Sequence, residues 1–474
     1  MNIKKEKPSI LWYDLETFGL NSHYDRIAQF AAIRTDLELN QIGKEIILYC
    51  KLTQDYLPDP LSCLVTSITP QEVNKKGLNE VEFIKQIRKE FLTPNTVVTG
   101  YNSINFDDEF IRNALYRNLY DPYEREYKNG CSRWDIINLV RAAYDLRPDN
   151  MNWPARKENG NPTFKLTDIT EANNIEQTGA HDALVDVRAT IEVARLIKTH
   201  QPKLYDWSFK HRKKQLVKNV VKAPFGEPIL HTHPSYTSKN GCTSIVMPIT
   251  YDVNNPNNVI CFNLKEDITP LIEADEENIL FTHGIVNIAY NKCPFVSPLV
   301  ILNKQLEKKL DIDRQETLSR ANTLKEHPEI ILKIRKALLN SDIKSIDDSD
   351  FQLYEGFFKD EDSKRFQLIH DAGEKEKLKL AKAIDFDDKR AKELVYRHIL
   401  RNYLEYQTEE EKEKWKSFCS HRIVSPPGNV MINLDFYNRK IKEKLESDTT
   451  SEKEKSILIE LQDYGQELIN ILFN

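Results

Sequence analysis

The residues most able to do chemistry are two carboxylates near the N-terminus, Asp14 and Glu16, separated by a single residue. They follow an apolar run at residues 10–13, which predicts a buried strand. Residues two apart on a strand point to the same face, so the two carboxylates are expected side by side. Mg²⁺ prefers oxygen ligands and neutralises such a pair. Taken alone, an Asp-x-Glu pair is more often a turn with solvated acids.

A third carboxylate, Asp107, follows an aromatic residue at the predicted start of a helix. This position would aim the side chain across the ends of the strands, where open α/β sheets bind their ligands. Asp107, Asp108 and Glu109 also suit the positive end of a helix dipole, so, taken alone, these acids are more often explained by capping.

The next candidate groups are His181 and Asp186. Apolar residues between Leu184 and Ala194 recur at helical spacing, which predicts an amphipathic helix to about Lys198. Five residues turn a helix by roughly 140°, so the imidazole is expected in the loop or first turn while the helix holds Asp186. A lone histidine at a helix start is more often a cap or a surface residue. Its spacing to an aspartate, together with the two earlier segments, weakens that interpretation.

Strands and helices in alternation are expected to position these groups. Strands are predicted at residues 29–34, 45–51 and 96–101. One helix is predicted to start at residue 70, where Thr69 and Glu72 form a capping box, and another to span residues 80–91. Strands followed by alternating helix and strand predict a mixed α/β sheet covered by helices.

The remainder of the chain changes character twice. Beyond residue 203, β-rich patterns at 243–250, 259–264 and 285–290 predict a small barrel or open sheet. A polar segment at 340–350 is expected to link this sheet to a helical C-terminal domain. There Thr408 and Glu411 give another capping box, and a helical stripe is formed by Ile457, Leu461, Tyr464, Leu468 and Ile471.

Composition limits the class of protein. The 474 residues suit two to four domains, and 40% hydrophobic with 30% charged residues is typical of soluble globular proteins. No run of about 18 apolar residues is present, so we expect a cytoplasmic protein without membrane contact. The seven scattered cysteines include no Cys-x-x-Cys and are expected to be reduced packing residues.

Charge is clustered locally, although the formal net charge of -6 does not indicate nucleic acid. Residues 203–222 hold seven Lys or Arg against one acid, Asp206. The basic run at 210–214 predicts either a surface for phosphates or a solvated helix face. His231 and His233 lack a third ligand at suitable spacing, so ordinary loop residues are expected there.

Single-stranded nucleic acid requires aromatic rings for base stacking and cations for phosphates. Residues 112–141 interleave both kinds, and Trp134 and Tyr144 are expected to pack in the core. The candidate strand contacts are Arg112, Tyr123, Tyr127, Arg141 and Lys165.

Together, Asp14-x-Glu16, Asp107 and His181-x4-Asp186 resemble the three motifs of the DnaQ-like exonuclease superfamily in its His-containing (DEDDh) branch. Over essentially the whole chain, the sequence is also similar to the bacterial exodeoxyribonuclease I family. That similarity is carried by DLETFG at 14–19, YDPY at 120–123, SRWD at 132–135, NWP at 152–154, NKCP at 291–294 and LYEGFF at 353–358. Lys165 departs from relatives that carry Arg, keeping the charge but losing the bidentate fork on phosphate.

This resemblance implies a ribonuclease H-like exonuclease domain at 1–201, an SH3-like β-rich domain at 202–350 and a helical domain at 351–474. It implies removal of nucleotides from the 3′ end of single-stranded DNA, with release of 5′-mononucleotides, in repair and recombination. The parts are expected to enclose the strand like a C. A monomer is expected that contacts the acidic tail of single-stranded-DNA-binding protein, through Arg147 and basic residues near Arg314.

For the reaction we expect two Mg²⁺ ions, with Mn²⁺ as a substitute, because two cations roughly 4 Å apart stabilise both the attacking and leaving oxygens. Asp14 is assigned to both ions, Glu16 and Asp186 to the tighter site, and Asp107 to the second. Glu16 is also assigned to the terminal 3′-hydroxyl. His181, with an ordinary pKa near 6.5, is suited to take a proton from the attacking water.

Two alternatives remain open from the residues. A DEDDh RNase or a polymerase-associated proofreader would use the same chemistry, but those resemblances cover only about the first 200 residues. A single-strand-binding scaffold without catalysis is the other, and five intact active-site side chains weigh against it.

Overall fold

A mixed sheet organises the N-terminal part of the protein. The computed structural model describes residues 7–177, 182–340, 346–428 and 432–473. Its first sheet has five strands in the order β3-β2-β1-β4-β5, in which β2 runs antiparallel to β1 and β4 runs parallel to it. The strands are β1 (Ser9–Thr17), β2 (Ile27–Thr35), β3 (Ile46–Tyr49), β4 (Thr96–Gly100) and β5 (Ser132–Asp135). The mixed α/β sheet predicted from the sequence is confirmed.

Helices cover both faces of this sheet, which explains why β1 reads as a continuous apolar run. The helices of the first 220 residues are α1 (Pro60–Thr66), α2 (Pro70–Lys76), α3 (Glu80–Phe91), α4 (Asp107–Arg117), α5 (Ile136–Leu146), α6 (Leu166–Ala172), α7 (Ala183–His200), α8 (Pro202–His211) and α9 (Lys214–Val220). Of these, α9 packs on the sheet of the middle part. Leu11 and Tyr13 of β1 pack with α3 and α4, whereas Ile10 and Trp12 pack with α5 and α7. The even-numbered side chains of β1 therefore face α7.

Core positions agree with the sequence in this part of the chain. Trp134 and Tyr144 are buried as expected. Thr69 caps α2 by accepting a hydrogen bond from the backbone N–H of Glu72, which confirms the predicted helix start. All seven cysteines are free and buried.

The middle part is a five-stranded antiparallel sheet in the order β10-β6-β7-β8-β9. Its elements are β6 (Ile229–Thr232), β7 (Thr243–Tyr251), β8 (Asn258–Asn263), α10 (Thr269–Glu273), β9 (Ile285–Ala289) and β10 (Phe295–Pro298), followed by α11 (Lys304–Leu310), α12 (Arg314–Lys325) and α13 (Glu329–Leu339). The predicted β-rich segments are confirmed. The expectation that His231 is a loop residue is wrong, because His231 lies in β6, opposite Ser244 of β7. Its ring is buried, and Nδ1 is hydrogen-bonded to the hydroxyl of Tyr236 at 3.0 Å.

The C-terminal part is helical, as predicted. It contains α14 (Asp360–Asp371), α15 (Lys377–Ala383), α16 (Lys389–Asn402), α17 (Glu409–Val424), α18 (Leu434–Leu445) and α19 (Glu452–Phe473). Thr408 caps α17 at the backbone N–H of Glu411. The predicted stripe on α19 is wrong at its last position, since Ile471 is 51% exposed and Leu472 is buried. Leu472 lies four residues after Leu468, which places it one helical turn further along the buried face.

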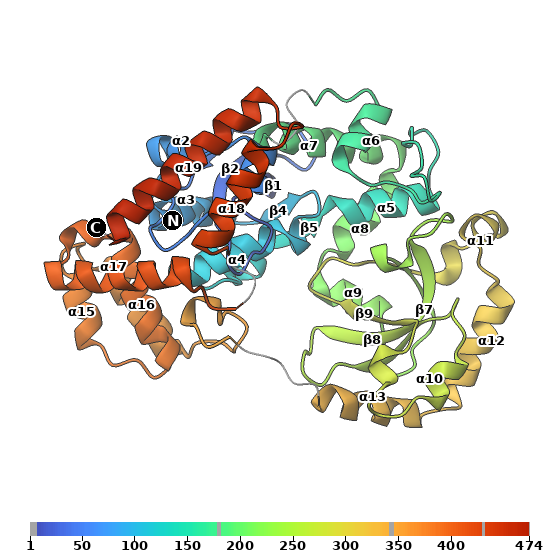
Figure 1. Ribbon diagram of the computed structural model, residues 1–474. Coiled ribbons are helices and arrows are strands. Elements are labelled where there is room, and N and C mark those ends of the chain that lie inside the picture. The colour runs from blue at the N-terminus through green and yellow to red at the C-terminus, as the bar shows by residue number, and fades with distance from the viewer. Residues whose placement is uncertain (1–6, 178–181, 341–345, 429–431, 474) are drawn as a thin grey trace.

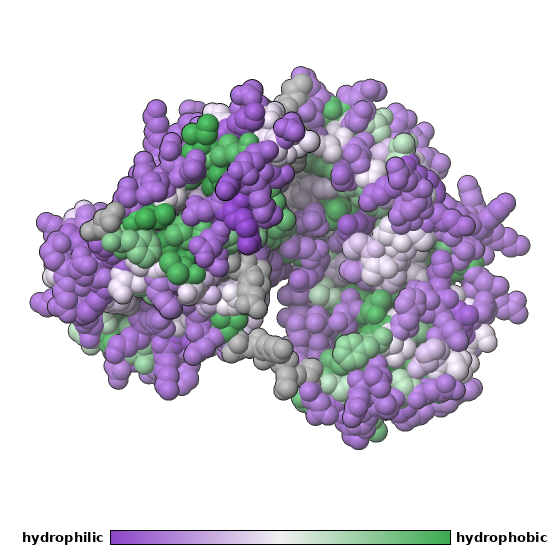
Figure 2. Space-filling model, viewed as in Figure 1, coloured by the Kyte–Doolittle hydropathy of each residue, from purple (hydrophilic) through white to green (hydrophobic). Residues whose placement is uncertain are grey.

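The C-terminal helices pack back on the N-terminal sheet domain. Figure 1 shows α18 and α19 beside the N-terminal elements, with the middle part on the other side of the molecule. Phe18 and Tyr56 from the N-terminal part share an apolar core with Trp415, Leu458 and other residues of the C-terminal helices. Figure 2 shows the surface hollowed between these two sides. Within the part of the chain that the structure describes, every helix is too short or too polar to cross a bilayer.

Candidate active site

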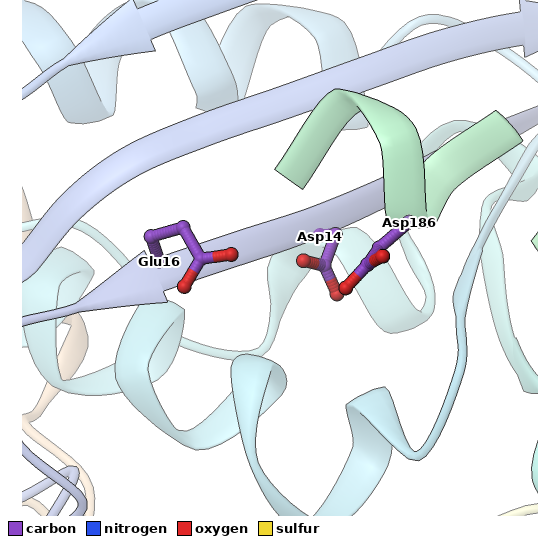
Figure 3. Close-up of side chains that lie close together, drawn as sticks. All are labelled: Asp14, Glu16 and Asp186. Carbon is purple, nitrogen blue, oxygen red and sulfur yellow. The ribbon is translucent and has the colours of Figure 1, made fainter. Parts of the chain in front are cut away.

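Three carboxylates meet where β1 passes under α7. Asp14 and Glu16 are even-numbered residues of β1 and face α7, and Asp186 lies in the first turn of that helix. One ligand oxygen from each of the three lies within 4.8 Å of the others. Figure 3 shows the two side chains of the strand turned toward one another, with Asp186 reaching them from the helix. Residues far apart in the sequence thus form one oxygen-rich cluster.

Asp107 approaches the same strand from α4. Its side chain is buried, and Oδ1 accepts a 3.1 Å hydrogen bond from the backbone N–H of Leu15, the residue between Asp14 and Glu16. Asp107 does not belong to the group of three whose ligand oxygens lie within 4.8 Å of one another. It therefore flanks the cluster and is held there by the backbone of β1.

Burial and mutual repulsion make this cluster electrostatically costly without a counter-charge. Burial raises the pKa of Asp14 well above its usual range, and the charges of Asp107, Glu16 and Asp186 raise it further. For the same reasons, burial first and then Asp186 and Asp107, the pKa of Glu16 rises to about 8. A divalent cation removes the repulsion directly. Carboxylate oxygens without nitrogen or sulfur donors fit a hard cation such as Mg²⁺ or Mn²⁺.

The segment before α7 carries the remaining predicted active-site residue. His181 lies outside the described residues. Asp182 caps α7, because its side chain accepts a 3.0 Å hydrogen bond from the backbone N–H of Leu184. The helix therefore begins where the sequence predicts.

Sequence reasoning missed two residues that touch this site. The side-chain amide of Gln177 donates a 2.6 Å hydrogen bond to Oδ1 of Asp186. The hydroxyl of Thr170 on α6 lies 2.6 Å from the oxygen of that amide. An isolated glutamine in a polar segment carries no sequence signal for such a role.

A groove of about 1800 Å³ is lined by residues from all three parts of the protein. Its wall includes Asn105 and Glu109, which lie on either side of Asp107 in the sequence. Among the residues that the structure describes, Asp14, Glu16 and Asp186 do not line the groove. Four of the five candidate strand contacts line it: Arg112, Tyr123, Tyr127 and Arg141. Lys165 is outside the lining residues that the structure describes and is exposed at the start of α6.

The four candidate strand contacts that line the groove differ in their exposure to solvent and in their partners within the protein. Arg112 is 4% exposed, pairs with Glu109 and Glu126 at 2.7 Å each, and lies over the ring of Tyr123. Its charge therefore organises the groove wall. Tyr127, in contrast, is 60% exposed. Arg141 is half-buried, with Nη1 donating a 3.2 Å hydrogen bond to Asn138.

Residues from the other two parts complete the groove. Arg212, Lys213 and Lys214 of the predicted basic run line it, so this end of the run is not simply a solvated helix face. Phe357 from the C-terminal part is 81% exposed and packs edge-on against Tyr123. Tyr354 donates a short hydrogen bond to Glu109, which links the C-terminal part to α4 next to Asp107.

Comparison with known protein families divides the chain in the same way. An exonuclease family model matches residues 11–194, a model of the exonuclease I SH3-like domain matches residues 212–339, and a model of the exonuclease I C-terminal domain matches residues 347–468. An exodeoxyribonuclease I from Buchnera aphidicola is 38% identical over 473 residues, covering 98% of this chain and 96% of the relative. The chain belongs to the exodeoxyribonuclease I family.

Other members of the exodeoxyribonuclease I family agree in sequence and fold. The Escherichia coli protein is 38% identical over 429 residues, which cover 88% of this chain and 90% of the relative. The solved structure of a moderately thermophilic exonuclease I from Methylocaldum szegediense has a TM-score of 0.91 at 39% identity, covering 98% of this chain and all of that one. By contrast, an oligoribonuclease from Actinobacillus pleuropneumoniae is 26% identical over 208 residues, only 42% of this chain.

Several family structures were solved with bound molecules. E. coli exonuclease I has been solved in complex with an oligonucleotide at 35% identity and a TM-score of 0.91. A zinc-bound form of its complex with single-stranded DNA has a TM-score of 0.89. An exonuclease I structure that includes SSB and an inhibitor has a TM-score of 0.90.

Proposed function

We propose that this protein is a single-stranded-DNA-specific 3′ to 5′ exodeoxyribonuclease that releases 5′-mononucleotides and acts in DNA repair and recombination in the cytoplasm. The observation that carries the proposal is the convergence of Asp14, Glu16 and Asp186 within 4.8 Å, in a protein with a groove lined by all three of its parts. Membership of the exodeoxyribonuclease I family supports the substrate and the direction of cleavage.

The carboxylates fit two Mg²⁺ ions, with Mn²⁺ as a substitute. Asp14 would contact both ions, Glu16 and Asp186 the tighter one, and Asp107 the second. When bound, such a pair of cations stabilises charge on the attacking and leaving oxygens of a phosphodiester. Asp107 supports the second position because Leu15 fixes it beside the same strand. The zinc-bound form of an E. coli relative with single-stranded DNA supports a cation in this family.

Proton transfer and end recognition are assigned to neighbouring side chains. His181 lies five residues before Asp186 in the sequence, and an imidazole is suited to accept the proton of the attacking water. Glu16, at the end of β1, would also accept a hydrogen bond from the terminal 3′-hydroxyl. That contact selects the end of a strand over its interior.

The groove supplies the surface for the single strand. Tyr127 presents its exposed ring for base stacking. The ring of Tyr123 packs against the guanidinium of Arg112. Arg141 is proposed to contact phosphate within the groove. Lys165 is proposed to do so near the acids, since its helix α6 packs against α7. The complexes of relatives with oligonucleotides support this use of the groove.

The partner and the domain division remain our proposals. We propose that the protein is a monomer that binds the acidic tail of single-stranded-DNA-binding protein through Arg147 and basic residues near Arg314, which lines a small pocket with Ile312 and Leu318. A solved exonuclease I structure that includes SSB supports this partner. The proposed divisions are 1–201, 202–350 and 351–474, and the order of sheets and helices supports them.

One assay tests the proposed reaction against the RNase, proofreading and scaffold alternatives. Labelled single-stranded DNA, its RNA counterpart and a duplex are each incubated with the protein in Mg²⁺ or in EDTA. We expect mononucleotide release from single-stranded DNA alone, abolished by EDTA. Preferred cleavage of RNA would favour an RNase, cleavage of the duplex a proofreader, and binding without cleavage a scaffold.

A further inference from the structure

A hydrogen-bonded chain of side chains reaches Asp186 from α6. The Nε2 atom of Gln177 lies 2.6 Å from Oδ1 of Asp186, and its Oε1 atom lies 2.6 Å from Oγ1 of Thr170. Thr170 is 1% exposed and lies on α6, which packs against α7. The chain therefore joins the buried face of one helix to a candidate metal ligand on another.

Chemistry fixes the direction of both hydrogen bonds. An ionised carboxylate only accepts, so the NH₂ group of Gln177 must face Asp186. The amide oxygen then faces Thr170, whose single hydroxyl hydrogen is directed at it, since this is the shortest of the acceptor contacts of that hydroxyl. Thr170 thus sets the orientation of the amide, and the amide sets the orientation of the carboxylate.

A neutral donor is suited to this position. Lysine or arginine at residue 177 would orient Asp186 equally well but would neutralise the negative charge that a cation needs. An amide restricts the carboxylate rotamer and leaves its charge available, which is how groups behind metal ligands raise affinity in other proteins.

We propose that Gln177 is a positioning residue of the cation site, which holds Asp186 for metal binding while Thr170 orients the Gln177 amide. The inference rests on the proposed function only in that the cluster binds a divalent cation. It assigns Gln177 no contact with the DNA or with the reacting atoms.

The test is a calorimetric titration of the full-length protein with Mn²⁺, which does not depend on nuclease activity. Gln177→Met keeps the length of the side chain and removes its donor, and we expect it to weaken Mn²⁺ binding about 10- to 100-fold. Thr170→Val should weaken binding less. In the Gln177→Met background it should have no further effect, because the hydroxyl acts through the amide. The matched control is Gln466→Met, because Gln466 is exposed on α19, where its amide donates a hydrogen bond to Asn470, and the Mn²⁺ affinity of this variant should equal that of the wild type.

Two further readings separate positioning from general stability. Without metal, Gln177→Met should unfold slightly below the wild-type temperature, because two hydrogen bonds are lost. Its stabilisation by added Mn²⁺ should in addition be smaller than that of the wild type. Mn²⁺ affinity within twofold of the wild type would overturn the proposal. The proposal would also be overturned if Thr170→Val weakened Mn²⁺ binding equally in the wild-type and the Gln177→Met proteins. If Gln177→Met does not fold, unchanged Mn²⁺ affinity in Thr170→Val alone overturns it.

The outcome is distinguishable from a failure of the proposed function. Weakened Mn²⁺ binding in Gln177→Met, in a protein that cleaves no DNA, would support the positioning role while removing the nuclease assignment. A wild-type protein that binds no Mn²⁺ would overturn the positioning role itself.

Discussion

Replacing Asp350 with Asn should destabilise the joint between the N-terminal and C-terminal parts of the protein. Asp350 is completely buried and accepts hydrogen bonds from three arginines: Arg397 at 3.0 Å, Arg401 at 2.5 and 3.0 Å, and Arg422 at 2.6 Å. Asp55 of the N-terminal part, also fully buried, accepts from Arg401 at 2.9 Å. The cluster therefore joins two domains through charges with little access to water.

The expected loss in the free energy of unfolding follows from the arginines that would lose Asp350 as a partner. Removing one member of a buried ion pair costs about 3–5 kcal/mol. Asp55 still pairs with Arg401 and Arg422, and Asp348 with Arg397 and Arg422, so we expect the lower end of that range. At about 2–4 °C per kcal/mol for a unit of 150–250 residues, this corresponds to a fall in Tm of about 6–12 °C.

The effect should depend on pH in a defined direction. Burial alone would raise the pKa of Asp350, but Arg401, Arg422 and Arg397 lower it well below its usual range. A carboxyl group with a lowered folded pKa stabilises the protein above its unfolded pKa, near 3.9, and loses this contribution as the pH falls through the folded value. The difference between Asp350→Asn and wild type should therefore be constant above about pH 5 and shrink below about pH 4.

Calorimetric melting of both proteins from pH 3 to pH 8 measures this directly. Asp371→Asn is the matched control, because Asp371 is exposed at the end of α14, within the segment that the C-terminal domain model also matches, and accepts a hydrogen bond from the amide of Gln367. It should leave Tm within about 1 °C of the wild type, as expected for a surface change. A shift of less than 1 kcal/mol for Asp350→Asn, or a shift that persists unchanged at pH 3, would refute the reasoning.

Three further predictions concern the site and the groove. Asp14→Asn should abolish nuclease activity by removing the metals, whereas His181→Ala should lower kcat about 10²- to 10⁴-fold and leave Mn²⁺ binding nearly intact; equal losses of rate and of metal affinity in both variants would contradict these roles. Tyr127→Ala should weaken binding of single-stranded DNA by about 1–3 kcal/mol in a fluorescence titration, because an exposed ring is lost from the groove; unchanged affinity would exclude that ring as a stacking platform. Affinity for single-stranded DNA should fall steeply between about 50 and 200 mM salt, and a flat salt dependence would argue against phosphate contacts along the groove.

The sequence predicts the parts of this site that follow from local periodicity. The period of two in β1 places Asp14 and Glu16 together, and the helical period of α7 gives Asp186 a fixed position. Capping signals at Thr69 and Thr408 locate two helix starts correctly. These features depend on neighbours within a few residues, so a single sequence contains them.

Local periodicity and capping signals do not predict contacts between segments that are distant in the sequence. Gln177 and Thr170 show no pattern in sequence, because their role depends on how α6 packs against α7. Asp55 and Asp350, almost 300 residues apart in the sequence, both pair with Arg401, and only tertiary packing brings them together. Arg112 is predicted to contact the DNA strand from its residue type, and its ion pairs with Glu109 and Glu126 have no signature in the sequence.

Asp14, Glu16 and Asp186 are proposed to bind the catalytic cations. Anomalous scattering from a crystal soaked in Mn²⁺ tests this proposal most directly. We expect a peak about 2.1 Å from carboxylate oxygens of Asp14 and Asp186, with Glu16 beside it, and the loss of that peak in Asp14→Asn. Saturating Mn²⁺ that binds elsewhere, or leaves this cluster without a peak, would contradict it.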